Sequence, residues 1–231
     1  QDTKAPTWST TATSLDATIE CSDANGLASA QAQFPSATDN CDSDVTNIVK
    51  TAGLFVASSS CANAGTYTNT WTVTDACGNT SSTFTQVITI QDTTAPTWST
   101  TAASLNTTIE CSDATAIAAT QALFPSATDN CDSDVTNIIK TVGQFVASEE
   151  CKNAGTYTNT WTVTDDCNNT SEVFTQVITI QDTSAPTWST TASSLNATIE
   201  CSDATAIAAA QAQFPVAADN CDSDVTNIVK N

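Results

Sequence analysis

Residues 66–74 read Thr-Tyr-Thr-Asn-Thr-Trp-Thr-Val-Thr, so that every second residue is a threonine. Successive side chains of an extended strand point to opposite faces, which places the threonines on one face and Asn69 and Trp71 on the other. Residues 75–79, Asp-Ala-Cys-Gly-Asn, are a turn signal, and residues 83–90 are again β-branched and apolar. We therefore predict a β-hairpin with Trp71 in the core.

Upstream of this hairpin the sequence predicts one short helix and several shorter strands. The helix follows a capping Ser22 or Asp23, contains residues 27–33 and ends before Pro35. The shorter strands are expected at residues 7–11, 17–21, 36–39, 45–50 and 54–57. Many short strands separated by regular turns predict an all-β fold, an immunoglobulin-like β-sandwich that carries one short helix.

The whole pattern returns every ninety residues. Residues 1–8 recur as residues 91–98 and again as residues 181–188, with only the fourth position changed. A period of this length predicts one domain per repeat, arranged in tandem. We expect repeat 1 at residues 1–90, repeat 2 at residues 91–180 and the N-terminal part of repeat 3 at residues 181–231.

Composition restricts the classes of function. The 231 residues carry 25 acidic side chains against five lysines, which gives a net charge of −20. Nucleic acids and anionic membranes would be repelled, and no apolar run is long enough to span a membrane. The chain has no Met and no His. We read it as an interior or processed piece of a longer protein, and the missing His removes the usual catalytic triads. No Gly-rich phosphate loop is present either, so we predict no enzyme and no catalytic residue.

Ten cysteines occur at the same positions of each repeat. Without His or paired Cys-x-x-Cys spacing they indicate disulfides rather than zinc, and hence an oxidising compartment: a cell surface, the periplasm or a secreted medium. The strand between Cys61 and Cys77 spans about 30 Å, whereas bridged Cα atoms lie within about 7 Å, so these two cannot pair. A Greek-key arrangement favours four bonds within repeats: Cys21–Cys61, Cys41–Cys77, Cys111–Cys151 and Cys131–Cys167. This scheme leaves Cys201 and Cys221 without partners, and local pairing of the type Cys21–Cys41 stays open.

Aspartates gather in turns at one end of each predicted sandwich, where the linker enters. Crowded carboxylates are unfavourable unless they are protonated or bind a cation, and hard oxygen ligands suit Ca²⁺. We therefore predict calcium sites. The alternative is that these aspartates cap turns through their own backbone. The candidate ligands are Asp2, Asp39, Asp42, Asp44, Asp75, Asp92, Asp129, Asp132, Asp134, Asp165, Asp182, Asp219, Asp222 and Asp224.

Glu20 and Lys50 also recur in every repeat. We expect a cross-strand salt bridge between them. The alternative is an isopeptide bond from the lysine, with the glutamate as its catalyst.

Three strings of sequence resemble a known family. They are Ala-Thr-Asp-Asn-Cys at residues 37–41, Trp-Thr-Val-Thr-Asp-Ala-Cys-Gly-Asn-Thr at residues 71–80, and Val-Ile-Thr-Ile-Gln-Asp-Thr-Thr-Ala-Pro at residues 87–96. Together they are similar to HYR-type immunoglobulin-like repeats, and more narrowly to the tandem repeats of giant cell-surface adhesins of Bacteroidetes.

The resemblance implies an extracellular structural stalk for cell adhesion or gliding motility, here disulfide-stapled and calcium-rigidified. The alternative function is a carbohydrate- or protein-binding module. The expected partners are neighbouring repeats of the same chain, together with surface glycans or other cell-surface proteins, and neither nucleic acid nor a membrane span is expected.

Overall fold

The computed structural model describes residues 1–230, and these divide into two compact units. Unit 1 contains Gln1–Thr100, Ser126–Ile139 and Thr162–Val173. Unit 2 contains Thr101–Pro125, Lys140–Trp161 and the described residues from Phe174 onward. Unit 1 therefore combines the first repeat with three segments of the second, residues 91–100, 126–139 and 162–173, and the domain boundaries at residues 90 and 180 stay a prediction.

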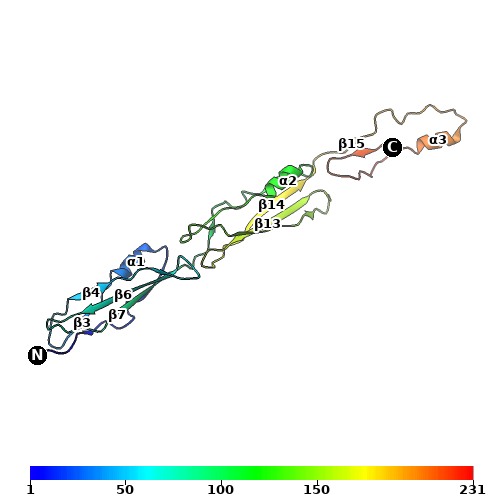
Figure 1. The fold of residues 1–231 in the computed structure, drawn as a ribbon. Helices are drawn as coiled ribbons and strands as arrows, with labels where there is room; N and C mark the ends of the chain where they lie inside the picture. The colour runs from blue at the N-terminus through cyan, green and yellow to red at the C-terminus, as the bar shows by residue number, and fades with distance from the viewer. Residues whose placement is uncertain (231) are drawn as a thin grey trace. The chain divides into compact units, whose positions relative to one another are not determined.

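The first repeat is built on a five-stranded sheet (Figure 1). Strands β6 (Gly65–Val73) and β7 (Phe84–Gln91) form its antiparallel centre, paired from Gly65↔Ile90 to Trp71↔Phe84. β2 (Ala17–Glu20) lies parallel to β7. β4 (Ile48–Thr51) and β5 (Val56–Ala57) both pair antiparallel with β6. The predicted hairpin is thus confirmed as the centre of the sheet.

A smaller layer and a helix cover this sheet. β1 (Thr7–Trp8) pairs with β3 (Ala37–Thr38), and the indole Nε1 of Trp8 donates a hydrogen bond of 2.8 Å to the carbonyl of Ser82. Helix α1 (Ala24–Gln31) begins at Asp23, whose carboxylate accepts from the backbone N–H of Gly26 at 2.8 Å. This side-chain cap satisfies one of the free N–H groups of the first turn, as the sequence predicts.

The face opposite the threonines forms the core. Trp71 is 1% exposed, and its ring packs edge-on against the rings of Phe34 and Phe84 at 6.0 Å each. Two polar residues are buried beside it: the side-chain amide of Asn69 donates to Gln86 Oε1 at 3.0 Å. The strict alternation of residues 66–74 therefore predicted the core face correctly.

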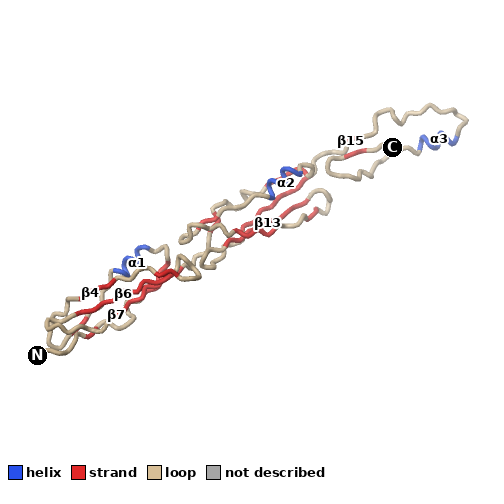
Figure 2. Tube along the Cα trace, in the orientation of Figure 1, coloured by secondary structure: helices blue, strands red, loops and turns tan. Residues whose placement is uncertain are grey.

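The second repeat contains the same elements in the same order, and the described part of the third contains three of them. Repeat 2 has β8 (Thr97–Trp98), β9 (Thr107–Glu110), α2 (Ala114–Gln121), β10 (Ala127–Thr128), β11 (Ile138–Thr141), β12 (Val146–Ala147), β13 (Gly155–Val163) and β14 (Phe174–Gln181). Repeat 3 has β15 (Thr187–Trp188), α3 (Ala204–Gln211) and β16 (Ala217–Ala218). Figure 2 shows that most of repeat 3 is loop. β9 pairs with β14, and the described part of repeat 3 has no counterpart of β14.

The fold class is as predicted: all-β tandem sandwiches with one short helix in each repeat. One local departure in sequence is also accommodated. The hairpin turn has Gly78 at φ 91° in repeat 1 and Asn168 at φ 71° in repeat 2. Asn tolerates this left-handed backbone better than most residues, so the turn is retained. Among the described residues no helix is long and apolar enough to cross a membrane.

Candidate functional site

The structure contains three disulfides, and each joins one repeat to the next. Cys21 bonds to Cys131 with a Cα–Cα distance of 5.8 Å, and Cys61 bonds to Cys167 with 4.6 Å. Both bonds lie within unit 1. Within unit 2, Cys111 bonds to Cys221 at 5.7 Å. We call the region around each set of bonds a joint.

This pairing corrects the bonds predicted from the sequence. Of the predicted pairs Cys21–Cys61, Cys41–Cys77, Cys111–Cys151 and Cys131–Cys167 none is formed, and neither is the local pair Cys21–Cys41. The cysteines left with free thiols are Cys41, Cys77, Cys151 and Cys201.

The physical reason is that the two cysteines of a predicted pair lie at the same end of a repeat, but the disulfides form with cysteines of the neighbouring repeat. The N–H of Cys21 bonds the carbonyl of Gln91 at 2.8 Å, and Cys61 precedes β6 at the same end of the sheet. Cys41 and Cys77 lie together at the opposite end, since Asp42 Oδ2 accepts from the N–H of Ala76 at 3.2 Å. Where repeats 1 and 2 meet, the end with Cys21 and Cys61 contacts the end with Cys131 and Cys167, which offers these cysteines nearer partners.

The bonds enclose long loops, with sequence separations of 110 residues for Cys21–Cys131 and 106 residues for Cys61–Cys167. In the chain-entropy description, closing a loop of this length stabilises the folded state by about 4–5 kcal/mol. Because the two loops overlap, the second bond to form contributes less than the first. Two covalent bonds therefore hold the joint, and once one has formed, the second causes little further loss of conformational entropy.

Glu20 contributes hydrogen bonds to the same joint. Its carboxylate accepts from Thr93 Oγ1 at 2.6 Å and from the side-chain amide of Gln91 at 2.8 Å. These bonds, that from Thr93 first, lower the pKa of Glu20 below its ordinary value. Glu110 repeats the arrangement with Thr183 and Gln181. The bonds from Thr93 and Thr183 thus connect β2 and β9 to the first linker residues of the next repeat.

The predicted salt bridge between Glu20 and Lys50 is not formed. Lys50 Nζ instead donates to the carbonyl of Gln31 and lies 5.2 Å above the ring of Trp71 and 5.8 Å from that of Phe34. The lysine therefore binds the C-terminal end of α1 above the core, whereas Glu20 accepts hydrogen bonds in the joint. The alternation of residues along strands could not distinguish these two roles, because both residues lie on short strands in which the pattern covers only a few positions.

Asparagines complete the polar contacts of the joint. Asn130 Nδ2 donates to Ser22 Oγ at 2.9 Å, and Asn220 repeats this bond with Ser112 at 3.0 Å. Asn169 Nδ2 donates to the backbone carbonyl of Asp92 at 3.1 Å. In the sequence, only their recurrence at a fixed spacing distinguishes these asparagines and serines from ordinary turn residues.

Three of the predicted calcium ligands converge in repeat 1, and two converge in repeat 2. In repeat 1 carboxylate oxygens of Asp2, Asp39 and Asp75 lie within 4.8 Å of one another. In repeat 2 Asp92 and Asp165 lie within the same distance of each other and of the Cys167 sulfur. Asp129 is the counterpart of Asp39 and acts electrostatically on Asp92. We call Asp92, Asp129 and Asp165 the joint carboxylates.

Two oxygens of the joint carboxylates are buried without a hydrogen-bond partner, namely Asp92 Oδ2 and Asp129 Oδ2. Asp92 is only 7% exposed. Burial raises the pKa of Asp92 above its ordinary value, and the charges of Asp129, Asp165 and Glu20 add to this shift. A buried carboxylate oxygen without a donor is costly, so this place favours either a proton or a cation.

The other predicted ligands lie in turns that aspartates cap. Asp39 Oδ1, besides its place in the cluster of repeat 1, accepts from the N–H groups of Cys41 and Asp42, and Asp42 Oδ1 accepts from that of Asp44. Asp44 is exposed. The counterparts Asp132, Asp134, Asp222 and Asp224 form the same turns. The alternative interpretation, aspartate as a turn cap, thus accounts for Asp42 and its counterparts.

The second joint repeats part of the cluster. Asp182 lies within 4.8 Å of Glu110 and of the sulfurs of Cys111 and Cys221, all in unit 2. Asp219 Oδ2 is buried without a hydrogen-bond partner, as is its counterpart Asp129 Oδ2. The same chemistry therefore recurs ninety residues along the chain.

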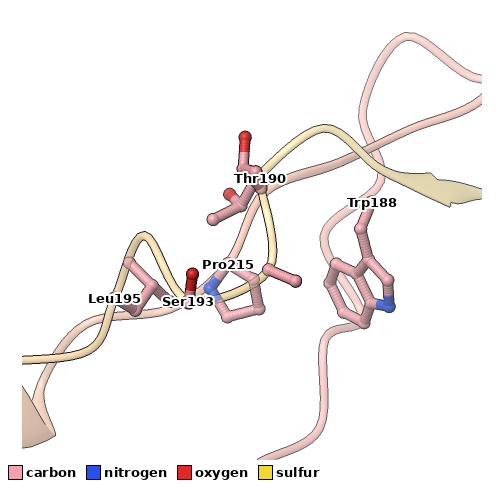
Figure 3. Close-up of a pocket in the computed structure, with 7 residues that line it drawn as sticks. Trp188, Thr190, Ser193, Leu195 and Pro215 are labelled. Carbon is pink, nitrogen blue, oxygen red and sulfur yellow. The ribbon is translucent and has the colours of Figure 1, made fainter.

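A pocket in the third repeat has a different origin. Trp188, Thr190, Ser193, Leu195 and Pro215 line it (Figure 3). In repeat 1 the counterpart Trp8 packs against Phe84 of β7, with ring centroids 5.5 Å apart. Trp188 is 62% exposed, because the described part of repeat 3 has no such strand. The pocket is therefore the open edge of an incomplete core rather than a ligand site.

The molecule thus belongs to the class of tandem β-sandwich proteins whose repeats are bonded to one another through cysteines. More specifically, the chain belongs to the family described as the HYR-like domain with 4 cysteines, which it matches at residues 9–90 and 99–180. The resemblance of the three sequence strings to HYR-type repeats is confirmed by this match.

Comparison with solved structures gives distant similarity. The chain is 12% identical to Drosophila N-cadherin EC1-4 over 78% of its own length and 50% of that chain, with a TM-score of 0.35. It is 9% identical to human mucin-like protocadherin EC1-2 over 78% of its own length and 100% of that chain, with a TM-score of 0.29. It is 14% identical to the fibronectin(III)-like modules of Clostridium thermocellum CbhA over 77% of its own length and 94% of that chain, with a TM-score of 0.25. The match therefore spans half the length of the cadherin chain. No curated protein matches the sequence.

Proposed function

We propose that the chain is a segment of the extracellular structural stalk of a repetitive surface adhesin. The observation that carries this proposal is the pair of bonds Cys21–Cys131 and Cys61–Cys167, which tie consecutive repeats together. Disulfides persist outside the reducing cytosol, which supports a location at the cell surface. Bonds between repeats, rather than within them, suit a protein that transmits force along its length.

The resemblance to adhesin repeats supports a finer proposal. The parent protein is a giant cell-surface adhesin of Bacteroidetes that serves cell adhesion and gliding motility, and the gliding-motility adhesin SprB is the member of this group whose repeats the chain resembles. In this proposal the motor and the adhesive tip lie elsewhere, and the repeats act as a spacer. Their partners are the neighbouring repeats, with surface glycans or other cell-surface proteins at the tip.

Pulling on the two ends of the chain tests the stalk. Through Cys21–Cys131 and Cys111–Cys221, the shortest covalent path from Gln1 to Asn231 contains roughly 50 residues, or about 180 Å when fully extended. The reduced chain would extend to about 800 Å at the same spacing per residue. We expect single-molecule force spectroscopy to find the short limit before reduction and the long limit after it.

Bonds within repeats would give a third value. With Cys21–Cys61 and Cys111–Cys151, and Cys61 to Cys77 as part of the path, roughly 150 residues remain free to extend, or about 500 Å. An oxidised chain that extends to this length, or further, would contradict the bonded stalk.

We further propose that Ca²⁺ binds the joint carboxylates. The buried oxygens of Asp92 and Asp129, which have no donor, and the raised pKa of Asp92 support a cation there. The oxygen donors of carboxylates and backbone carbonyls are the ligands that Ca²⁺ prefers. Asp2, Asp39 and Asp75 would form the equivalent site in repeat 1, and Asp182 and Asp219 part of one in repeat 3.

Thermal unfolding tests this metal site. We expect millimolar CaCl₂ to raise the melting temperature of the metal-free protein, and EGTA to reverse the increase, because only the folded state brings the joint carboxylates together. MgCl₂ at the same ionic strength should have a smaller effect, since Mg²⁺ requires stricter octahedral geometry. An unchanged melting temperature in CaCl₂ would reject calcium and leave the disulfide stalk untouched.

One observation supports the alternative of a carbohydrate- or protein-binding module. Beside the Cys21–Cys131 bond, within unit 1, a cavity of about 290 Å³ is lined by Phe55 and Tyr67 together with polar residues that include Asn63 and Asn130. Aromatic rings beside amides are suited to sugar rings. A glycan array probed with the whole chain tests this function, and specific binding that is lost in Tyr67→Ala would favour it over a pure spacer.

A further inference from the structure

The four free cysteines occupy the same positions as the bonded ones. Cys41 and Cys77 lie ninety residues before Cys131 and Cys167, which are bonded to repeat 1. Cys151 and Cys201 lie ninety and one hundred and eighty residues after Cys61 and Cys21, which are bonded to repeat 2. Each free thiol is therefore one half of a bond that the molecule forms elsewhere.

Repeat 1 carries a complete but uncovered copy of the surface that repeat 2 uses in the joint. We call this surface the docking face; it consists of Asp2, Asp39, Cys41, Asp75 and Cys77. Cys41 and Cys77 are both exposed, whereas their counterparts Cys131 and Cys167 are half-buried.

The carboxylates differ in the same direction. Asp2 is half-buried where its counterpart Asp92 is 7% exposed, and the unpartnered buried oxygen of Asp129 has no equivalent at Asp39. In repeat 2 the cover is provided by repeat 1.

The docking face is also formed before any partner arrives. Asp39 Oδ1 accepts from the N–H of Cys41 at 2.9 Å, and Asp75 Oδ1 accepts from the N–H of Cys77 at 2.9 Å. The bonded counterparts keep these contacts, with Cys131 on Asp129 and Cys167 on Asp165 at 2.8 Å each. The two thiols are thus already held in the loop geometry in which Cys131 and Cys167 form their bonds.

We propose that the docking face binds the end of another copy of this same repeat and is bonded to it through two disulfides. Cys41 would bond to the partner's counterpart of Cys21, and Cys77 to its counterpart of Cys61. The partner's counterparts of Glu20 and Ser22 would accept the same hydrogen bonds as in the observed joint. Because the two ends of a repeat are different and complementary, copies join head to tail, and the contact can be extended without closing on itself.

Each bond forms by thiol–disulfide exchange, in which atoms and electrons balance. Two thiols lose two protons and two electrons as the S–S bond forms, and a disulfide oxidant such as oxidised glutathione accepts them and leaves as two molecules of the reduced thiol. No other reactant is needed.

Adding one repeat to the chain tests this proposal. Residues 1–90 are duplicated in front of Gln1, and the original and extended proteins are oxidised with glutathione disulfide, alkylated without reduction and mapped as peptides. In the original chain we expect alkylation at Cys41, Cys77, Cys151 and Cys201. In the extended chain Cys41 and Cys77 should be protected by bonds to the added copy, while two cysteines of the added copy become alkylated. The number of free thiols then stays at four although four cysteines were added.

A matched variant makes the test specific. If the added copy carries Ser at its counterpart of Cys21, Cys41 should again be alkylated while Cys77 stays bonded. Continued alkylation of both Cys41 and Cys77 in the extended chain would overturn the proposal, and so would a bond between them. Neither result depends on calcium, because the thiol count is read in EGTA.

Discussion

At the scale of single residues, the joint places opposite demands on its carboxylates. Glu20 is surrounded by donors, which lower its pKa, whereas Asp92 is buried beside other carboxylates, which raises its pKa. The sequence shows both as recurrent acidic residues and offers no sign of this difference. Donor contacts across the joint, such as that from Thr93, decide it, and these depend on how one repeat meets the next.

The pKa of Glu20 should rise when its strongest donor is removed. In Thr93→Val the hydroxyl bond of 2.6 Å is lost while the β-branched shape is kept, so the pKa of Glu20 should move back toward 4.5. Because the folded pKa lies below the unfolded one, these bonds stabilise the fold above about pH 4.5, and their contribution is lost as the pH falls through the folded pKa. NMR titration of the Glu20 carboxyl measures the shift. Thr94→Val is the control, because Thr94 is exposed and bonds Asp92 through its backbone N–H, and an equal shift in both variants would contradict the assignment.

Replacing Asp92 by Asn should separate the effect of charge from that of shape. Without calcium, Asp92→Asn removes a buried charge whose Oδ2 has no donor and whose Oδ1 accepts only from the N–H of Thr94, and we expect a higher melting temperature than for the unmodified chain. In CaCl₂ the variant should gain less than the unmodified chain, because only the equivalent site of Asp2, Asp39 and Asp75 keeps all its carboxylates. Asp166→Asn is the control, since Asp166 is exposed in the neighbouring turn and repeat 1 has Ala76 there. A variant that still responds fully to calcium would place the metal elsewhere.

At the scale of elements, alternation and turn signals were sufficient for most of the first repeat. The predicted strand at residues 66–74 is found as β6 (Gly65–Val73), and the helix begins at its predicted cap Asp23. Errors are confined to the ends of short elements: the strand expected at residues 7–11 is reduced to Thr7–Trp8. The position of a two-residue strand is determined by the strand that it pairs with, here β3. Periodicity within the segment does not identify that partner.

Gln86 connects more elements than its place in β7 suggests. Its amide donates to the carbonyls of Leu15 and Ala30, and its oxygen accepts from Asn69. Gln86→Leu would strand these groups, each at a cost of about 1–3 kcal/mol. Urea unfolding can be monitored by tryptophan fluorescence, and we expect the urea concentration at the midpoint to fall clearly.

The neighbouring position provides the control for this variant. Thr85 lies on the exposed face of the same strand, and Thr85→Val should change the unfolding free energy by no more than about 0.5 kcal/mol. Equal effects of the two variants would mean that the buried network is not what holds β6, β7 and α1 together.

At the scale of the whole molecule, the sequence predicted the repeat and its fold but not its connections. Cys21 and Cys61 lie at one end of a repeat, and Cys41 and Cys77 at the other, so the members of each predicted pair do lie at a common end. The predicted bonds are wrong because they all close within a repeat. In a tandem array the nearest partner of a terminal cysteine belongs to the neighbour, and Cys221, which the predicted scheme left unpaired, was the available signal.

Cutting the backbone between repeats should leave the molecule in one piece. A protease site inserted between Thr94 and Ala95 separates residues 1–94 from the rest of the chain, yet Cys21–Cys131 and Cys61–Cys167 still connect the two fragments. On a denaturing gel without reductant, we expect one band after complete cleavage, and two after dithiothreitol. Cys21→Ser or Cys61→Ser alone should keep the single band, because one bond is enough, whereas the double variant should split without reductant. Bonds confined to single repeats would release two fragments from the unmodified cysteines, and that result would contradict the joint on which the stalk depends.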